Sequence, residues 1–175
     1  NDDYGKDYLK GLKDGLGAKA SMVVAESSFE TTEPTIDSHI VKLKASGADV
    51  FFNFATPKFA AQAIKKMGEL SWKPLHVLNN VSASIGAVIK PAGVEHSQGI
   101  ISAAFMKDAT DPRWKDDPGM KRFDAFLKQY MPEADRRDGY IMYGYNTAQT
   151  MAAVLKYAGD NLTREYSGTG LGLSI

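Results

Sequence analysis

Apolar residues along this chain recur in two alternating patterns, one typical of amphipathic helices and the other of short buried strands. The helical spacing predicts helices over residues 2–17, 35–45, 56–70, 82–89, 117–131 and 140–158. Apolar, β-branched runs predict strands over residues 21–25, 49–54, 76–78 and 99–106. Short connections between alternating helices and strands are typical of an α/β fold. We therefore expect a three-layer domain with a mainly parallel sheet flanked by helices.

Local signals predict where several of these elements begin and end. Asp3 is a candidate N-cap for the first helix, and Gly17 is placed to end it. Thr56 followed by Pro57 indicates a helix start with proline at the first helical position. We expect Pro91 to stop the helix over residues 82–89.

The strand over residues 49–54 (DVFFNF) is apolar without alternation, which indicates a strand covered on both faces. The pattern as a whole starts on a helix, although a helix in such a sheet normally follows a strand. We therefore expect that the first strand of the fold is missing ahead of Asn1.

The balance of charged residues and the length of the apolar runs indicate which kinds of partner the chain lacks. Lys plus Arg and Asp plus Glu are 21 each, so the chain lacks the basic surplus that nucleic acid or an anionic membrane requires. We expect no nucleic-acid partner and no membrane insertion, because no apolar run approaches the roughly 20 residues of a membrane span. The chain has no cysteine, which removes thiolate nucleophiles and disulfides.

Several polar side chains lie at positions where a ligand binds in folds of this class. In open α/β sheets, ligands bind at the carboxyl ends of strands, beside helix N-termini that favour anions. Tyr4, Thr56, Asn79 and Asn80 occupy such positions and supply neutral hydrogen-bonding groups. Each has a structural alternative: Thr56 as a helix cap, the two asparagines as turn formers and Tyr4 as a packing residue. The pattern favours a binding cleft over a catalytic one.

The sequence carries none of the common catalytic motifs, so we expect no enzyme, no cofactor and no metal. Phosphate-binding, nucleophile-elbow and zinc-protease motifs are missing from the sequence. The three histidines, His39, His76 and His96, lack metal-ligand spacing. The acidic cluster of Asp108, Asp111, Asp116 and Asp117 lacks EF-hand spacing and is typical of a solvated loop.

Long segments resemble the second lobe of branched-chain amino-acid-type (type I) periplasmic solute-binding proteins. They include DDYGKDYLKGLKDGLG, IVKLKASGADVFFNFATP, LNNVSASIGAVIKPAG and the run from Asp108 to Glu165. In that family two α/β lobes close on a small solute. The resemblance implies the solute-binding component of an ABC importer, a periplasmic location and, for a full-length protein, an ABC permease as partner.

The resemblance also implies a set of site residues. Tyr4 matches a tyrosine that lines the second-lobe side of the pocket. Ala55 stands where some members place a pocket tyrosine, so Phe54 or Thr56 would replace that contact. Asn80 stands where amino-acid-binding members carry an acidic residue that pairs with the ligand's ammonium. This departure favours an organic acid without an ammonium, aromatic or aliphatic, over an amino acid.

By the same resemblance, residues 1–138 form the second-lobe domain, and residues 139–165 a return-crossing helix that normally packs on the first lobe. Without that lobe, the helix would pack against the rest of this chain or against a second copy, and the second alternative predicts a homodimer. Residues 166–175 (YSGTGLGLSI) resemble the glycine box of histidine kinase ATP-binding domains but lack the G-x-G-x-x-G spacing. Two alternatives follow: a sensor module fused to a histidine kinase, or a non-functional fragment with a nucleotide-binding-like tail.

Overall fold

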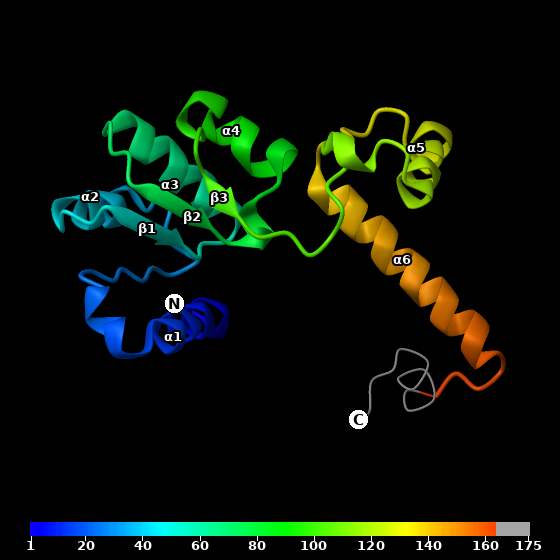
Figure 1. Cartoon of the computed structure of the whole chain (residues 1–175), viewed down its shortest axis with the longest axis horizontal. Helices are drawn as coiled ribbons and strands as arrows, with labels where there is room; N and C mark the ends of the chain where they lie inside the picture. Colours follow the sequence, from blue (N-terminus) through cyan, green and yellow to red (C-terminus); the bar gives the residue numbers. More distant parts are fainter. Residues whose placement is uncertain (164–175) are drawn as a thin grey trace. The chain divides into compact units, whose positions relative to one another are not determined.

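A computed structural model describes residues 1–163 of the chain (Figure 1). It divides into two compact units, one over residues 1–105 and one that begins at Met106, and each is described by itself. The predicted tail over residues 166–175 lies outside the described residues. The predicted boundary after residue 138 stays a prediction.

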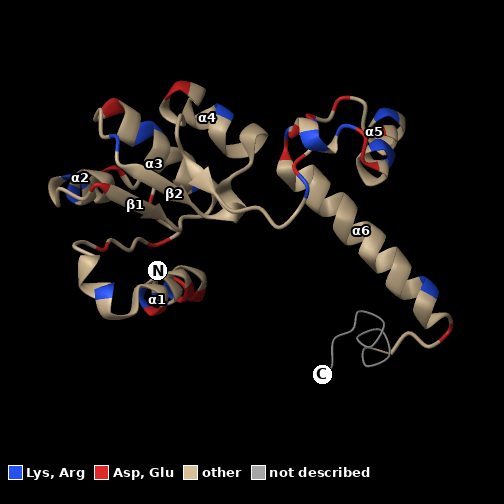
Figure 2. Cartoon of the chain, in the orientation of Figure 1, with Lys and Arg blue, Asp and Glu red and all other residues tan. Residues whose placement is uncertain are grey.

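The first unit is built on a three-stranded parallel sheet, which confirms the predicted α/β class. Its strands are β1 (Val50–Asn53), β2 (Leu75–Leu78) and β3 (Ile101–Ser102), in the order β1-β2-β3. Their sequences, VFFN, LHVL and IS, contain no charged residue (Figure 2). The flanking helices are α1 (Asp3–Leu16), α2 (Asp37–Ala45) and α3 (Pro57–Glu69), followed by short turns at Gly17–Met22, Asn80–Ser82 and Val94–His96.

The core of this unit lies mainly under α3. Ala60, Ala63 and Ile64 recur at helical spacing and are at most 1% exposed, as their spacing predicts. They pack in one cluster with Leu78 of β2 and with Val88. This packing fixes the carboxyl ends of β1 and β2 relative to the N-terminus of α3.

Three strand predictions need correction. Residues 17–22 form a 3₁₀-helix, and residues 23–25 are extended without a ladder partner, although a strand is predicted over 21–25. The β-branched sequence favours a strand, but a strand also needs a hydrogen-bonded neighbour. In β1, Phe51 and Asn53 are buried whereas Val50 and Phe52 are each 38% exposed, so only one face is covered. The strand predicted over 99–106 pairs at two residues only.

Helix ends also differ from prediction at two places. Asp2, not Asp3, caps α1, because its Oδ1 accepts a hydrogen bond of 2.9 Å from the Gly5 amide. After β2, a π-helical turn (Ile85–Ile89) continues into α4 (Lys90–Ala92). Pro91 lies in the first turn of α4, where its missing N–H costs little, so the helix runs past it and ends before Gly93.

The second unit is helical, with a 3₁₀ turn at Pro112–Trp114 and the helices α5 (Pro118–Tyr130) and α6 (Gly139–Ala158). Both long helices are predicted from the sequence. The ring of Phe123 is fully buried among apolar side chains that include Met120, Leu127 and Met142.

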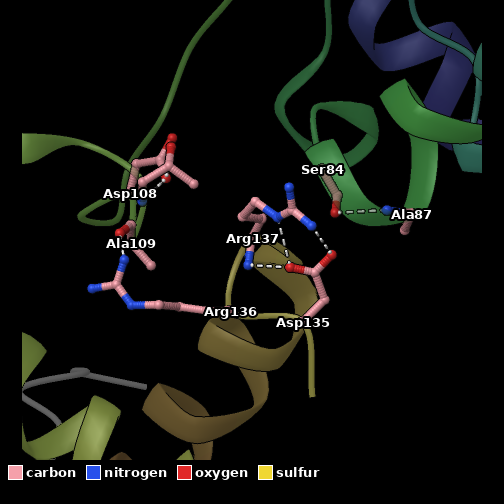
Figure 3. A network of polar contacts seen from close by, with 8 residues as sticks. Ser84, Ala87, Asp108, Ala109, Asp135, Arg136 and Arg137 are labelled. Carbon is pink, nitrogen blue, oxygen red and sulfur yellow. Dashed lines mark hydrogen bonds and ion pairs between the residues drawn. The ribbon is translucent and has the colours of Figure 1, made fainter. Parts of the chain in front are cut away.

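Polar contacts in the segment before α6 stabilise the local chain path (Figure 3). The Arg136 guanidinium donates to the Ala109 carbonyl and, at 2.6 and 3.1 Å, to both carboxylate oxygens of Asp124. Arg137 donates to both oxygens of Asp135 at 2.9 and 3.1 Å. Within the described residues, no helix combines the length and the apolar character that a bilayer crossing requires.

Candidate ligand-binding site

Two tyrosine–asparagine hydrogen bonds join α1 to the loop that follows β2. The Tyr4 hydroxyl donates to Asn79 Oδ1 at 3.0 Å, and the Tyr8 hydroxyl donates to Asn80 Oδ1 at 3.0 Å. Tyr4 and Tyr8 are four residues apart, so both face the same side of the helix. The structure thus brings together the predicted site residues Tyr4, Asn79 and Asn80 from segments more than 70 residues apart.

Asn79 connects the carboxyl ends of β1 and β2. Its Nδ2 donates to the carbonyls of Asn53 at 3.0 Å and Ala55 at 2.8 Å. Its Oδ1 also accepts from the Ser82 amide at 3.0 Å, and the residue is only 6% exposed. These bonds use both amide protons and both lone pairs of the side chain. Asn79 therefore positions its neighbours, and a direct ligand contact by it stays a prediction.

A row of aromatic rings borders this site. Tyr4 and Tyr8 have ring centroids 4.8 Å apart, Tyr8 stacks on Phe54 at 5.0 Å with an interplanar angle of 28°, and Phe52 follows Phe54 at 6.1 Å. The predicted residue Phe54 therefore lies with Tyr4, although Tyr8 stands between them. Sequence reasoning missed Tyr8 as a site residue. Its spacing of four from Tyr4 was the available signal.

Thr56 and Ala55 lie between β1 and α3. Thr56 has the N-cap position of α3 with an extended backbone, but its side chain makes no capping hydrogen bond. The structural alternative for Thr56, a side-chain cap, is therefore not observed. Ala55 is 8% exposed and contributes backbone groups: its amide donates to Asn53 Oδ1 at 3.1 Å, and its carbonyl accepts from Ser82 Oγ at 2.7 Å.

A cavity of about 940 Å³ lies in the first unit beside these residues. Four of the six predicted site residues line it, namely Tyr4, Phe54, Ala55 and Thr56. The other two, Asn79 and Asn80, are hydrogen bonded to the tyrosines. The structure therefore gathers all six predicted site residues near the carboxyl ends of β1 and β2.

The polar side chains at this site are uncharged hydroxyls and amides, and the buried imidazole in the adjacent strand is uncharged as well. His76 in β2 is 5% exposed, and burial lowers its pKa to about 4, so its ring is neutral at pH 7. Its Nε2 and the Nδ2 of Asn53 are buried without a hydrogen-bond partner within the described residues. The same residues hold no group of three side chains placed to bind a metal ion. Hydroxyls, amides and the α3 N-terminus can bind a polar or anionic solute.

Comparisons with known proteins place this geometry in a family. A family model described as periplasmic binding protein matches residues 1–166. The solved structure of Rp1789 from Rhodopseudomonas palustris (strain CGA009) is similar, with a TM-score of 0.76 at 22% sequence identity. That match covers 98% of this chain and 50% of the other, so this chain spans about half the length of Rp1789 and shares its fold. A search among curated proteins gave no match. Because the family model covers most of its residues, this chain belongs to the periplasmic binding protein family.

Proposed function

We propose that this chain is the solute-binding component of an ABC importer in the periplasm and that its solute is a small organic acid. Membership of a family of solute-binding, generally non-enzymatic proteins supports the first part. The convergence of Tyr4, Phe54, Ala55, Thr56, Asn79 and Asn80 at one sheet edge supports these six as ligand-binding residues, with Tyr8 added.

The preference for an acid without an ammonium rests on Asn80. Its neutral amide stands at the α1-facing edge of the site, hydrogen bonded to Tyr8, where a carboxylate would be needed to pair with an ammonium. Burying an unpaired ammonium is unfavourable. The N-terminus of α3 favours a carboxylate at the same edge. The ring row of Tyr4, Tyr8 and Phe54 favours an aromatic acid, because planar rings stack well on such a surface.

A thermal-shift series tests the ligand class. Benzoate, an aliphatic acid of similar size and leucine are titrated against the wild type, Asn80→Asp and the exposed control Asn161→Asp. We expect an acid to raise the melting temperature of the wild type and of the control by a few degrees, since binding at about 100 Kd adds about 2.7 kcal/mol. Asn80→Asp should lose this shift and gain one with leucine. Tighter binding of leucine than of any acid by the wild type refutes the proposal.

The importer role needs a separate experiment, because a receptor fused to a histidine kinase would bind the same solute. Uptake of the radiolabelled acid is measured in cells with and without the gene. Import predicts that uptake falls when the gene is deleted and returns on complementation. A change in kinase autophosphorylation without a change in uptake favours the sensor alternative.

We also propose that α6 mediates a homodimer. This helix carries a single charged residue, Lys156 (Figure 2). It exposes large apolar side chains that include Tyr143, Met151, Leu155 and Tyr157. Light scattering coupled to size exclusion should report a dimer that Leu155→Lys dissociates. A monomer at high concentration in the wild type refutes the dimer.

A further inference from the structure

A serine, a histidine and a glutamate form a row of hydrogen bonds between the first turn of α2 and the segment that precedes it. Ser27 Oγ and His39 Nδ1 are 2.8 Å apart, and His39 Nε2 lies 3.0 Å from Glu33 Oε2. All three residues are half-buried, and all lie within residues 27–39. This is the order of nucleophile, base and carboxylate in a catalytic triad, which is recognised by geometry and not by sequence position.

The protonation of His39 follows from its two partners. An ionised carboxylate can only accept hydrogen bonds, so His39 Nε2 carries the proton and donates it to Glu33. His39 Nδ1 then has a lone pair, which accepts from the Ser27 hydroxyl. Glu33 is fixed by a second bond, because its Oε1 accepts from the Glu30 amide at 2.8 Å. The bonds from Glu30 and His39 lower the pKa of Glu33, so the carboxylate is ionised at pH 7.

The first turn of α2 supplies backbone donors beside Ser27. Nδ1 is the ring nitrogen nearer to the backbone of its own residue, so the Ser27 hydroxyl lies at the N-terminal end of this helix. The N-cap residue Ile36 makes no side-chain capping bond, and the amides of Ser38 and His39 have no intrahelical acceptor. Such amides, with the partial positive charge of the helix end, stabilise negative charge that develops on a carbonyl oxygen.

The surroundings of Ser27 indicate the class of substrate. Glu30 and Glu33 carry negative charge close to the serine, which disfavours an anionic substrate. The ring of Phe29 supplies apolar surface, because its centroid lies 4.7 Å from that of Phe59 and 6.0 Å from that of His39. This combination favours an uncharged molecule with an apolar acyl group.

We propose that Ser27 is a nucleophile that hydrolyses small uncharged carboxylic esters, with His39 as its general base and Glu33 as a positioning residue. Ser27 Oγ forms a bond to the ester carbonyl carbon while its proton moves to His39 Nδ1. The tetrahedral intermediate expels the alcohol, which takes that proton, and the acyl group stays on Ser27. A water molecule gives a proton to His39 and attacks the acyl group, which releases the acid and restores the serine. The inference does not rest on solute binding at the Tyr4–Asn79 site.

Labelling with a fluorophosphonate probe tests the nucleophile, because such probes react with activated serine hydroxyls. We expect covalent labelling of the wild type, which peptide mass spectrometry assigns to Ser27. Ser27→Ala should lose the label. The matched variant Ser28→Ala, at the exposed neighbouring serine, should be labelled like the wild type. An unlabelled wild type, or a label that lies on Ser28, overturns the proposal.

Hydrolysis of p-nitrophenyl butyrate measures turnover and separates the roles of the two partners. His39→Ala should lower kcat at least about 100-fold. Glu33→Gln keeps an acceptor for Nε2–H but removes the charge that stabilises the imidazolium, so kcat should fall at least about tenfold at unchanged KM. Thermal denaturation identifies variants that remain folded. Wild-type kcat in folded His39→Ala, or full activity in Ser27→Ala, overturns the nucleophile; a change in KM alone with Glu33→Gln overturns its positioning role.

Discussion

Replacing Asn79 tests how the two strand ends are held together. In Asn79→Ala, four hydrogen bonds of 2.8–3.0 Å disappear from a residue that is 6% exposed. The carbonyls of Asn53 and Ala55 each keep one other donor, the Asn79 amide and Ser82 Oγ. At a net value of about 0.5–1.5 kcal/mol per bond, four bonds amount to about 2–6 kcal/mol. Because both carbonyls keep a donor, we expect a loss of unfolding free energy in the lower part of that range, about 2–4 kcal/mol. Urea denaturation at pH 7 measures it.

The isosteric variant Asn79→Asp separates donor loss from cavity effects. Its new carboxylate keeps the acceptor for Tyr4 and Ser82 but turns an oxygen toward the carbonyls of Asn53 and Ala55. Burial and these carbonyls raise the pKa of the carboxyl above its unfolded value. The variant is therefore least stable at pH 7, with an expected loss of about 3–5 kcal/mol.

The stability deficit of Asn79→Asp should shrink as pH falls, by up to about 1.4 kcal/mol per pH unit, because the protonated carboxyl donates to a carbonyl. Denaturation of all three proteins between pH 7 and pH 5 checks this, with each variant compared with the wild type at the same pH. Asn79→Ala should show a constant deficit. If Asn79→Asp is as stable as the wild type at pH 7, or if its deficit does not depend on pH, the amide donors do not hold the strand ends.

Three further predictions concern other parts of the chain. The folded pKa of His76, about 4, lies below the unfolded value of about 6.5. The stability that this burial contributes is therefore present above pH 6.5 and falls by about 3 kcal/mol toward pH 4. In urea denaturation, the His76→Leu variant should not show this pH dependence. A Cβ on Gly68 would lie 2.2 Å from Nδ1 of His96. Gly68→Ala should therefore cost about 1–3 kcal/mol in thermal denaturation, and His96→Ala should restore most of it. Phe123→Ala should destabilise the second unit by about 3–5 kcal/mol, measured by near-ultraviolet circular dichroism, because the ring is fully buried; a smaller loss than with Phe123→Leu contradicts this packing.

Sequence patterns correctly predict the parts of the fold in which apolar residues recur at the spacing of one regular element. The buried stripe of α3 and the ring of Phe123 in α5 follow helical spacing, which depends on residues three and four positions apart. The extended residues 23–25 show the limit of such patterns. Their β-branched side chains favour a strand, but strand formation depends on a neighbour elsewhere in the chain.

The candidate site shows the same division. Placing Tyr4, Asn79 and Asn80 at one edge follows from the rule that carboxyl ends of parallel strands meet. The pairing of each asparagine with its own tyrosine does not follow, because it depends on the rotation of α1 about its axis. Tyr8 was missed for that reason.

The helix α1 packs on the rest of the first unit without burying any of its residues, and this affects the affinity that a solute titration would measure. No residue of α1 is buried, and the contacts of its side chains with the segments that follow β1 and β2 include two hydroxyl–amide hydrogen bonds and one ring stack. If the free energy of detaching this helix is small, a fraction of molecules has the helix detached, and those molecules lack Tyr4 and Tyr8, two of the residues proposed to bind the solute. The apparent dissociation constant then equals the intrinsic one divided by the seated fraction. Substitutions on the outer surface of the helix that favour seating would tighten solute capture without touching the solute.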